Sequence, residues 1–81
     1  MAAQDAAGLN AARHDLGLSI DELFIRYFAL GGAENLATVQ TFLGGGGEPL
    51  QRLQYDTLVL AVNERYLEVG QDPPFPYAED R

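Results

Sequence analysis

The fold of this chain is decided by residues 50–69, whose sequence is LQRLQYDTLVLAVNERYLEV. This run contains no glycine or proline, and its apolar residues recur with the period of an α-helix. Pro49 stands just before it, where proline fits the first turn of a helix, and Gly70 supplies a stop signal. The pattern therefore predicts a long helix over 49–69. The β-branched residues within 57–62 also suit a buried strand, and this alternative stays open.

Two apolar stripes run along this predicted helix. We expect the first to face the core, and its members are Leu50, Leu53, Thr57, Leu60, Ala61 and Leu67. The second stripe supplies candidate partner-binding residues on an outer face, namely Tyr55, Val59, Tyr66 and Val69. Together the stripes span more than half of the helix circumference. In so short a chain, such a helix either forms the centre of the core or is covered by a second chain.

A second helix is predicted over 19–30. Ser19 and Glu22 have the spacing of a capping box, and the glycines at 31–32 end the helix. Its core-facing positions repeat every three or four residues: Ile20, Leu23, Phe24, Tyr27, Phe28 and Leu30. Ile25 falls on the outward side among polar neighbours, which makes it another candidate contact for a partner.

The other segments complete a small all-α bundle. Apolar spacing predicts a helix over 34–43, and the four glycines at 44–47 end it in a connector. An alanine-rich stretch predicts a short N-terminal helix over 9–16, after a frayed start at 1–8. We therefore predict one helical domain, 9–70, with three main helices and a short fourth.

The last segment, 71–81, is rich in proline and acidic residues. Its prolines favour extended geometry, which is typical of short recognition segments. The alternative is a tail that folds back and places Phe75 and Tyr77 against the core. Both aromatic residues are candidate partner contacts under the first interpretation.

Composition excludes several classes of protein. The 81 residues are enough for one domain, and the absence of cysteine excludes disulfides and cysteine metal sites. No apolar run approaches the roughly 18 residues of a membrane span. The first residues lack the pattern of a secretory signal, so we expect a cytoplasmic protein without membrane contact.

Residues for catalysis are scarce. His14 is the only histidine, and the only serine, Ser19, is expected to cap a helix. The glycines at 44–47 are followed by Glu48, so they do not form a phosphate-binding loop. We therefore expect no catalytic, cofactor-binding or metal-binding residues. An enzyme or small-molecule binder remains an alternative, with its pocket near His14, Tyr27 or Tyr55.

DNA binding is the other alternative. Residues 11–19 and the helix that follows resemble a helix-turn-helix. However, the second helix begins with Asp21 and Glu22, and Arg26 is its only basic residue. The net charge of −7 also opposes contact with phosphates.

Three stretches resemble a group of small, largely uncharacterised helical proteins of high-GC actinobacteria. They are LSIDELFIRYFALGG at 18–32, FLG at 42–44 and LAVNER at 60–65. The resemblance implies a helical fold and a regulatory role, and it supplies no catalytic residues. We therefore predict a non-enzymatic protein-interaction or regulatory module. It would act through the long C-terminal helix, on a protein partner or as a homodimer.

Overall fold

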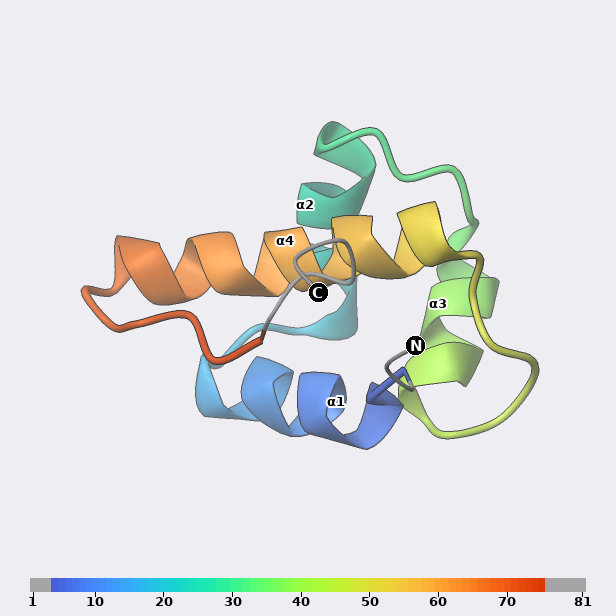
Figure 1. Ribbon diagram of the computed structural model, residues 1–81, viewed down its shortest axis with the longest axis horizontal. Coiled ribbons are helices and arrows are strands. Elements are labelled where there is room, and N and C mark those ends of the chain that lie inside the picture. Colours follow the sequence, from blue (N-terminus) through green and yellow to red (C-terminus); the bar gives the residue numbers. More distant parts are fainter. Residues whose placement is uncertain (1–3, 76–81) are drawn as a thin grey trace.

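The computed structural model describes residues 4–75, which contain four α-helices and no strand (Figure 1). The helices are α1 (Ala6–Asp15), α2 (Ile20–Ala29), α3 (Leu36–Leu43) and α4 (Arg52–Glu68). The predicted all-α class is thus confirmed. The strand alternative for 57–62 is wrong, because these residues lie in the middle of α4.

α1 is longer than the predicted 9–16. It begins at Ala6 because the Asp5 side chain caps it, accepting a hydrogen bond from the Gly8 amide at 2.9 Å. Residues 6–8 are therefore helical, and the expectation that they are frayed is wrong. Leu9 is fully buried, so α1 contributes to the core in its own right.

α4 begins three residues later than predicted. Its N-cap, Gln51, makes no side-chain cap hydrogen bond. The loop before it is held instead by the Gln4 side chain, which accepts from the Leu50 amide at 2.9 Å and donates to the Leu50 carbonyl at 2.6 Å. The N-terminal end of the described chain is thereby tied to the start of α4.

The helices pack in a closed ring of contacts. α4 contacts α1 and α2, and α3 contacts the same two helices. In Figure 1, α4 crosses the middle, with α1 below it and α2 above. The Cα radius of gyration is 11.5 Å, close to the roughly 12 Å expected for a compact domain of this size. The largest fully buried side chains come from all four helices: Leu9, Leu23, Tyr27, Val39, Leu58, Val59 and Val62.

A buried hydrogen-bond network joins α2 to α4. The Tyr27 hydroxyl donates to Oε1 of Gln54, which also accepts from the Ala33 amide at 2.8 Å. The same hydroxyl accepts from the Glu34 amide at 2.9 Å. Gly32 lies against the Tyr27 ring, and a Cβ there would be 2.3 Å from a ring carbon. The loop after α2 therefore closes over Tyr27.

The chain reverses after α4. Gly70 has φ 79°, a left-handed conformation that favours glycine, and residues 71–75 run back along the helix (Figure 1). The Gln71 amide donates to the Tyr66 carbonyl at 2.9 Å. Asn63 Nδ2 donates to the Phe75 carbonyl at 2.9 Å, and the Phe75 side chain packs partly buried against the core.

Candidate functional site

The outward side of α4 carries three leucines seven residues apart. Leu53 is 71% exposed, Leu67 is 61% exposed, and Leu60 between them is half-buried. Seven residues are close to two helical turns, so the three side chains project in the same direction. We call Leu53, Leu60 and Leu67 the outer leucine face. Large exposed apolar side chains in a row are typical of protein-contact surfaces.

This face is the reverse of the one that the sequence predicts. Val59 is fully buried and Tyr66 is only 7% exposed, so neither lies on an outer surface. Leu53 and Leu67, expected in the core, are exposed. The prediction is thus wrong for these four residues, whereas Leu50 and Ala61 are buried as predicted and Val69 is exposed as predicted. Burial raises the pKa of the Tyr66 hydroxyl, and the Asp15 carboxylate adds to the rise.

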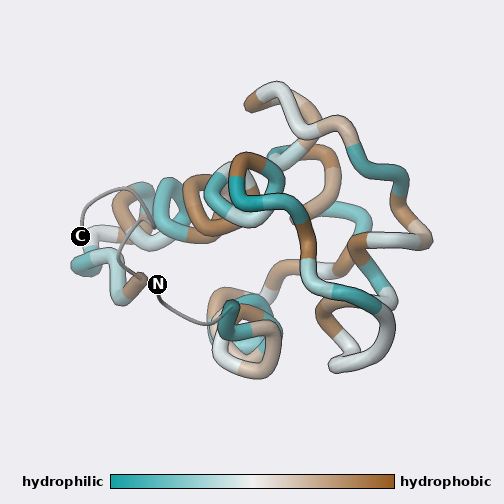
Figure 2. Tube along the Cα trace, turned by 45° about the vertical axis from the view of Figure 1, so that its right-hand side comes forward, coloured by the Kyte–Doolittle hydropathy of each residue, from teal (hydrophilic) through white to brown (hydrophobic). Residues whose placement is uncertain are grey.

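Two polar residues of α4 are buried together with its apolar ones. Hydrophobic residues occur along the whole length of α4 (Figure 2), so hydrophobicity alone does not decide which side faces inward. Gln54 and Asn63 are both buried, and each side chain has a hydrogen-bond partner elsewhere in the fold. Nine residues place the two amides about 180° apart around the helix, so they border the buried side of α4 on its two edges, and Asn63 Oδ1 itself has no hydrogen-bond partner among the described residues.

The two remaining candidates on this segment differ in exposure. Tyr55 is half-buried, with its ring edge-on to Phe42 at a centroid distance of 6.1 Å. Its hydroxyl accepts from the Asp5 amide at 3.0 Å, so Tyr55 serves the packing of α1 and α3 against α4. Val69 is 42% exposed and lies just beyond the end of α4.

α2 presents a second exposed apolar pair. Ile25 is 67% exposed, as expected from its outward position. Phe28 is 66% exposed, so the prediction that it faces the core is wrong. The Phe28 ring stacks on Phe24 at a centroid distance of 6.2 Å. Phe28 is thus supported by an intrahelical neighbour rather than by the core.

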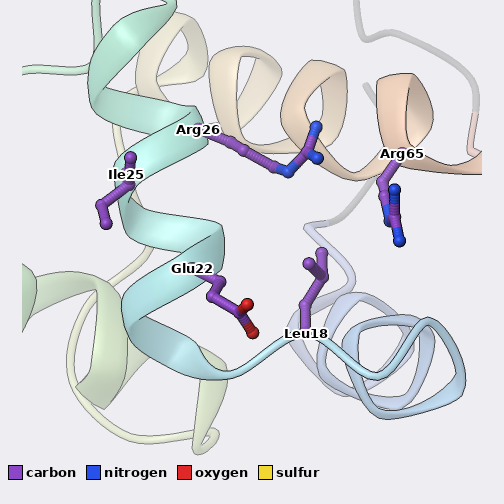
Figure 3. Close-up of a pocket in the computed structure, with 5 residues that line it drawn as sticks. All are labelled: Leu18, Glu22, Ile25, Arg26 and Arg65. Carbon is purple, nitrogen blue, oxygen red and sulfur yellow. The ribbon is translucent and has the colours of Figure 1, made fainter. Parts of the chain in front are cut away.

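A shallow depression lies beside Ile25, between α2 and α4. Figure 3 shows the Glu22 and Arg26 side chains pointing from α2 toward Leu18 and Arg65. Leu18, the only buried member, forms the apolar floor. None of His14, Tyr27 or Tyr55, the residues at which a small-molecule pocket is expected, lines this depression.

The arginines at this depression are held by one carboxylate. Glu68 accepts from Arg26 Nη1 and Nη2 at 2.9 and 2.8 Å, and from Arg65 Nη1 at 3.1 Å. The hydrogen bonds from Arg26, which have the larger effect, and the one from Arg65 lower the pKa of Glu68 to about 2. The bond to Glu68 in turn raises the pKa of Arg26. Both guanidinium groups are therefore engaged within the fold.

Ser19 and Glu22 form the capping box that their spacing predicts. Ser19 Oγ accepts from the Glu22 amide at 3.0 Å, and Glu22 Oε1 accepts from the Ser19 amide at 2.8 Å. The backbone hydrogen bond from Ser19 is the main cause of the lowered pKa of Glu22. The only serine of the chain therefore acts as a helix cap.

The residues considered for catalysis form no recognisable site. His14 is exposed, and its Nε2 lies 3.0 Å from Nη2 of Arg13. Arg13 is buried and donates to the Leu18 carbonyl at 2.8 Å, which ties the end of α1 to the turn before α2. Among residues 4–75, no three His, Cys, Asp or Glu side chains are grouped to hold a metal ion.

The tail is described only as far as Phe75, which folds back onto the core. The fold-back alternative is therefore correct for Phe75. Tyr77, the other aromatic candidate, lies outside the described residues.

No protein-family model, curated protein or solved structure matches the chain. The resemblance to actinobacterial helical proteins stays a prediction. Across residues 4–75, no helix combines the length and the apolar character needed to span a membrane.

Proposed function

We propose that this protein is a non-enzymatic interaction module that binds another protein chain through the outward side of α4. The observation that carries the proposal is the outer leucine face, with Leu53 71% and Leu67 61% exposed. Burying this exposed apolar surface against a partner is favourable, at roughly 25 cal/mol per Å² removed from water. The regulatory role implied by the actinobacterial resemblance is part of the same proposal.

The side chains inward of this face support the proposal. Leu58, Val59 and Val62 are fully buried directly behind it, so the helix that presents the leucines is firmly anchored. A contact surface on a rigid helix loses little conformational entropy on binding. α4 also has 17 residues, about 25 Å, which is long enough for a helical partner to lie along it.

DNA binding is less well supported than protein binding. The outward residues of α2, which would be the recognition helix, are Asp21, Glu22, Ile25 and Phe28. Arg26, the only base of that helix, is held by Glu68. Carboxylates and apolar side chains do not neutralise phosphates. A duplex-binding assay at low salt tests this alternative directly.

Affinity capture from the cells that make the protein tests the proposal. The bait is the full chain, compared with the double variant Leu53→Gln, Leu67→Gln. We expect a protein that is retained by the wild type and lost from this variant. The matched control is Ile25→Gln, Phe28→Gln, which removes two equally exposed apolar side chains from α2.

Self-association is measured in parallel by sedimentation equilibrium. A dimer that the Leu53→Gln, Leu67→Gln variant dissociates also supports the proposed surface, with the second copy as partner. If the α2 control loses every retained protein and the α4 variant loses none, the contact surface lies on α2 and the proposal is wrong.

A further inference from the structure

The side-chain amide of Asn63 is buried on α4, yet only half of it is paired. The residue is 1% exposed, and its Nδ2 donates to the Phe75 carbonyl at 2.9 Å. Its Oδ1 is buried from water and accepts no hydrogen bond from residues 4–75. A buried acceptor without a donor opposes folding, so a group that supplied the donor would gain free energy.

Residues 71–75, which we call the C-terminal strap, lie beside this amide. The strap follows the chain reversal at Gly70 and runs back along α4 (Figure 1). Residues 71–74 are exposed, and Phe75 is half-buried. Besides the bond from Asn63, the strap is held to the described chain by the Gln71 amide, which donates to the Tyr66 carbonyl. A segment with so few buried contacts opens more readily than the core.

The strap leaves Asn63 Oδ1 without a donor. Pro73 and Pro74 have no N–H to offer. The Phe75 N–H does not reach Oδ1, although the carbonyl of the same residue is bound to Nδ2. In an extended residue the N–H and C=O point to the same side of the chain. A single asparagine amide can therefore pair with both groups of one extended residue, and the strap uses only half of this capacity.

We propose that the place of the C-terminal strap beside Asn63 is a binding site for an extended segment of a partner protein, and that the strap competes with this segment. The strap shows the chemistry of the ligand, because it places an aromatic ring against the core and a main-chain carbonyl on Asn63. The partner segment has an aromatic residue in the place of Phe75. The N–H of that residue donates to Oδ1, and its C=O accepts from Nδ2.

Binding of such a segment opens the strap at Gly70. The free energy comes from pairing the buried acceptor, which the strap leaves unpaired. The strap, being part of the same chain, competes at a high effective concentration and so lowers the affinity for the partner. This inference goes beyond the proposed function, because the outer leucine face shares no residue with the strap or with Asn63.

NMR titration of the isotope-labelled full chain tests the proposal. The probe is the hexapeptide QDAAFA with acetyl and amide ends, in which alanines replace the two prolines before the phenylalanine. Its matched control has N-methylphenylalanine, which keeps the ring and the carbonyl and lacks the N–H. The receptor is the full chain with Phe75→Ala, which weakens the strap, compared with the wild type.

We expect the probe to shift the side-chain amide signals of Asn63 in the Phe75→Ala chain, with a dissociation constant below about 1 mM. The N-methylated control should bind at least about fivefold more weakly, because it leaves Oδ1 unpaired. The wild type should bind the probe at least about fivefold more weakly than the Phe75→Ala chain, because its own strap competes.

Further variants in the Phe75→Ala chain locate the contact. Asn63→Leu replaces the amide with an apolar group of similar size, and it should remove the preference for the probe over its control. Ile25→Gln, Phe28→Gln changes two exposed residues of α2 and should leave the affinity unchanged. Circular dichroism shows whether each variant keeps its helix content. If Asn63→Leu does not fold, the two peptides titrated into the Phe75→Ala chain decide the question.

Three results overturn the inference. They are no binding of the probe to the Phe75→Ala chain, equal binding of the probe and its N-methylated control, and binding that leaves the Asn63 amide signals in place. Each of them leaves the proposed function standing, because that function is tested by variants of the outer leucine face. Conversely, a strap site that binds the probe does not rescue the proposed function if no captured protein or dimer depends on the leucines.

Discussion

The Tyr27 hydroxyl on α2 donates its hydrogen bond to the buried Gln54 side chain on α4. Gln54 is the neighbour of Leu53, and one residue along a helix turns the side chain by about 100°. Gln54 is accordingly buried, whereas Leu53, one residue earlier, is 71% exposed. This hydrogen bond joins the core of α2 to the N-terminal part of α4, next to the outer leucine face.

Tyr27→Phe should destabilise the fold by about 1–2 kcal/mol. The change removes the donor to Gln54 and leaves the Glu34 amide without its partner in a partly buried position. Urea denaturation followed by circular dichroism measures the free energy of unfolding. Tyr55→Phe is the control, since the Tyr55 hydroxyl accepts only an exposed bond from Asp5. An equal loss of unfolding free energy in the two variants would show that the buried network contributes no more than the exposed hydrogen bond.

Gly32→Ala should cost about 1–3 kcal/mol, because the new Cβ would overlap the Tyr27 ring. The Gln54 bond restrains that ring from moving away. Gly44→Ala is the matched control: Gly44 has φ −76°, and its nearest contact for an added Cβ is at 3.5 Å. Gly44→Ala should therefore stabilise the fold by about 0.5 kcal/mol. Thermal melts measure the melting temperatures of both variants. A Gly32→Ala variant as stable as the wild type would show that the loop does not pack against Tyr27.

Val59→Ala should destabilise the fold by about 2 kcal/mol, because Val59 is fully buried and its truncation leaves a cavity. Leu53→Gln, six residues earlier, should change the free energy of unfolding by less than about 0.5 kcal/mol. The sequence stripes predict the opposite order. Urea denaturation of the two variants distinguishes them, and a larger loss for Leu53→Gln would mean that α4 is rotated differently.

The link between Arg26 and Glu68 should make stability fall in acid. The pKa of Glu68 in the folded protein is about 2, below its ordinary value of 4.5. The unfolded chain therefore takes up the proton first as the pH falls, which favours unfolding. The stabilisation by Glu68 is complete above about pH 4.5 and is lost between pH 4.5 and about 2.

Thermal melts of the wild type and Glu68→Gln from pH 7 to pH 2 check this expectation. The wild type should melt at the higher temperature near neutral pH, and the difference should shrink as Glu68 is protonated. A difference that stays constant over this range would show that Glu68 does not act through its charge.

Much of the local structure was predictable from the sequence. The capping box at Ser19 and Glu22 and the glycine at 70 act within one or two helical turns, so residue spacing is enough to recognise them. The start of α1 was missed. Asp5 caps that helix, but it stands among alanines, with no apolar run after it to mark a helix start.

The candidate site was predictable only in part. The sequence correctly indicated an exposed Ile25 and a long helix with more apolar surface than one side needs. It assigned Val59 and Tyr66 to the outside, although both are buried. Phe28 was placed inside because its spacing fits the core stripe of α2, yet it stacks on Phe24 at the surface.

The sequence by itself determined that the chain forms helices, where α2 and α3 start and end to within two residues, and that α4 carries two apolar stripes. Only the tertiary structure decided which stripe is buried. The physical reason is that both stripes gain similar free energy from burial, so hydrophobicity does not choose between them. The choice depends on contacts from distant parts of the chain, such as the hydrogen bonds that join Gln54 to Tyr27 and Asn63 to the Phe75 carbonyl, and the spacing of residues within α4 does not reveal these contacts.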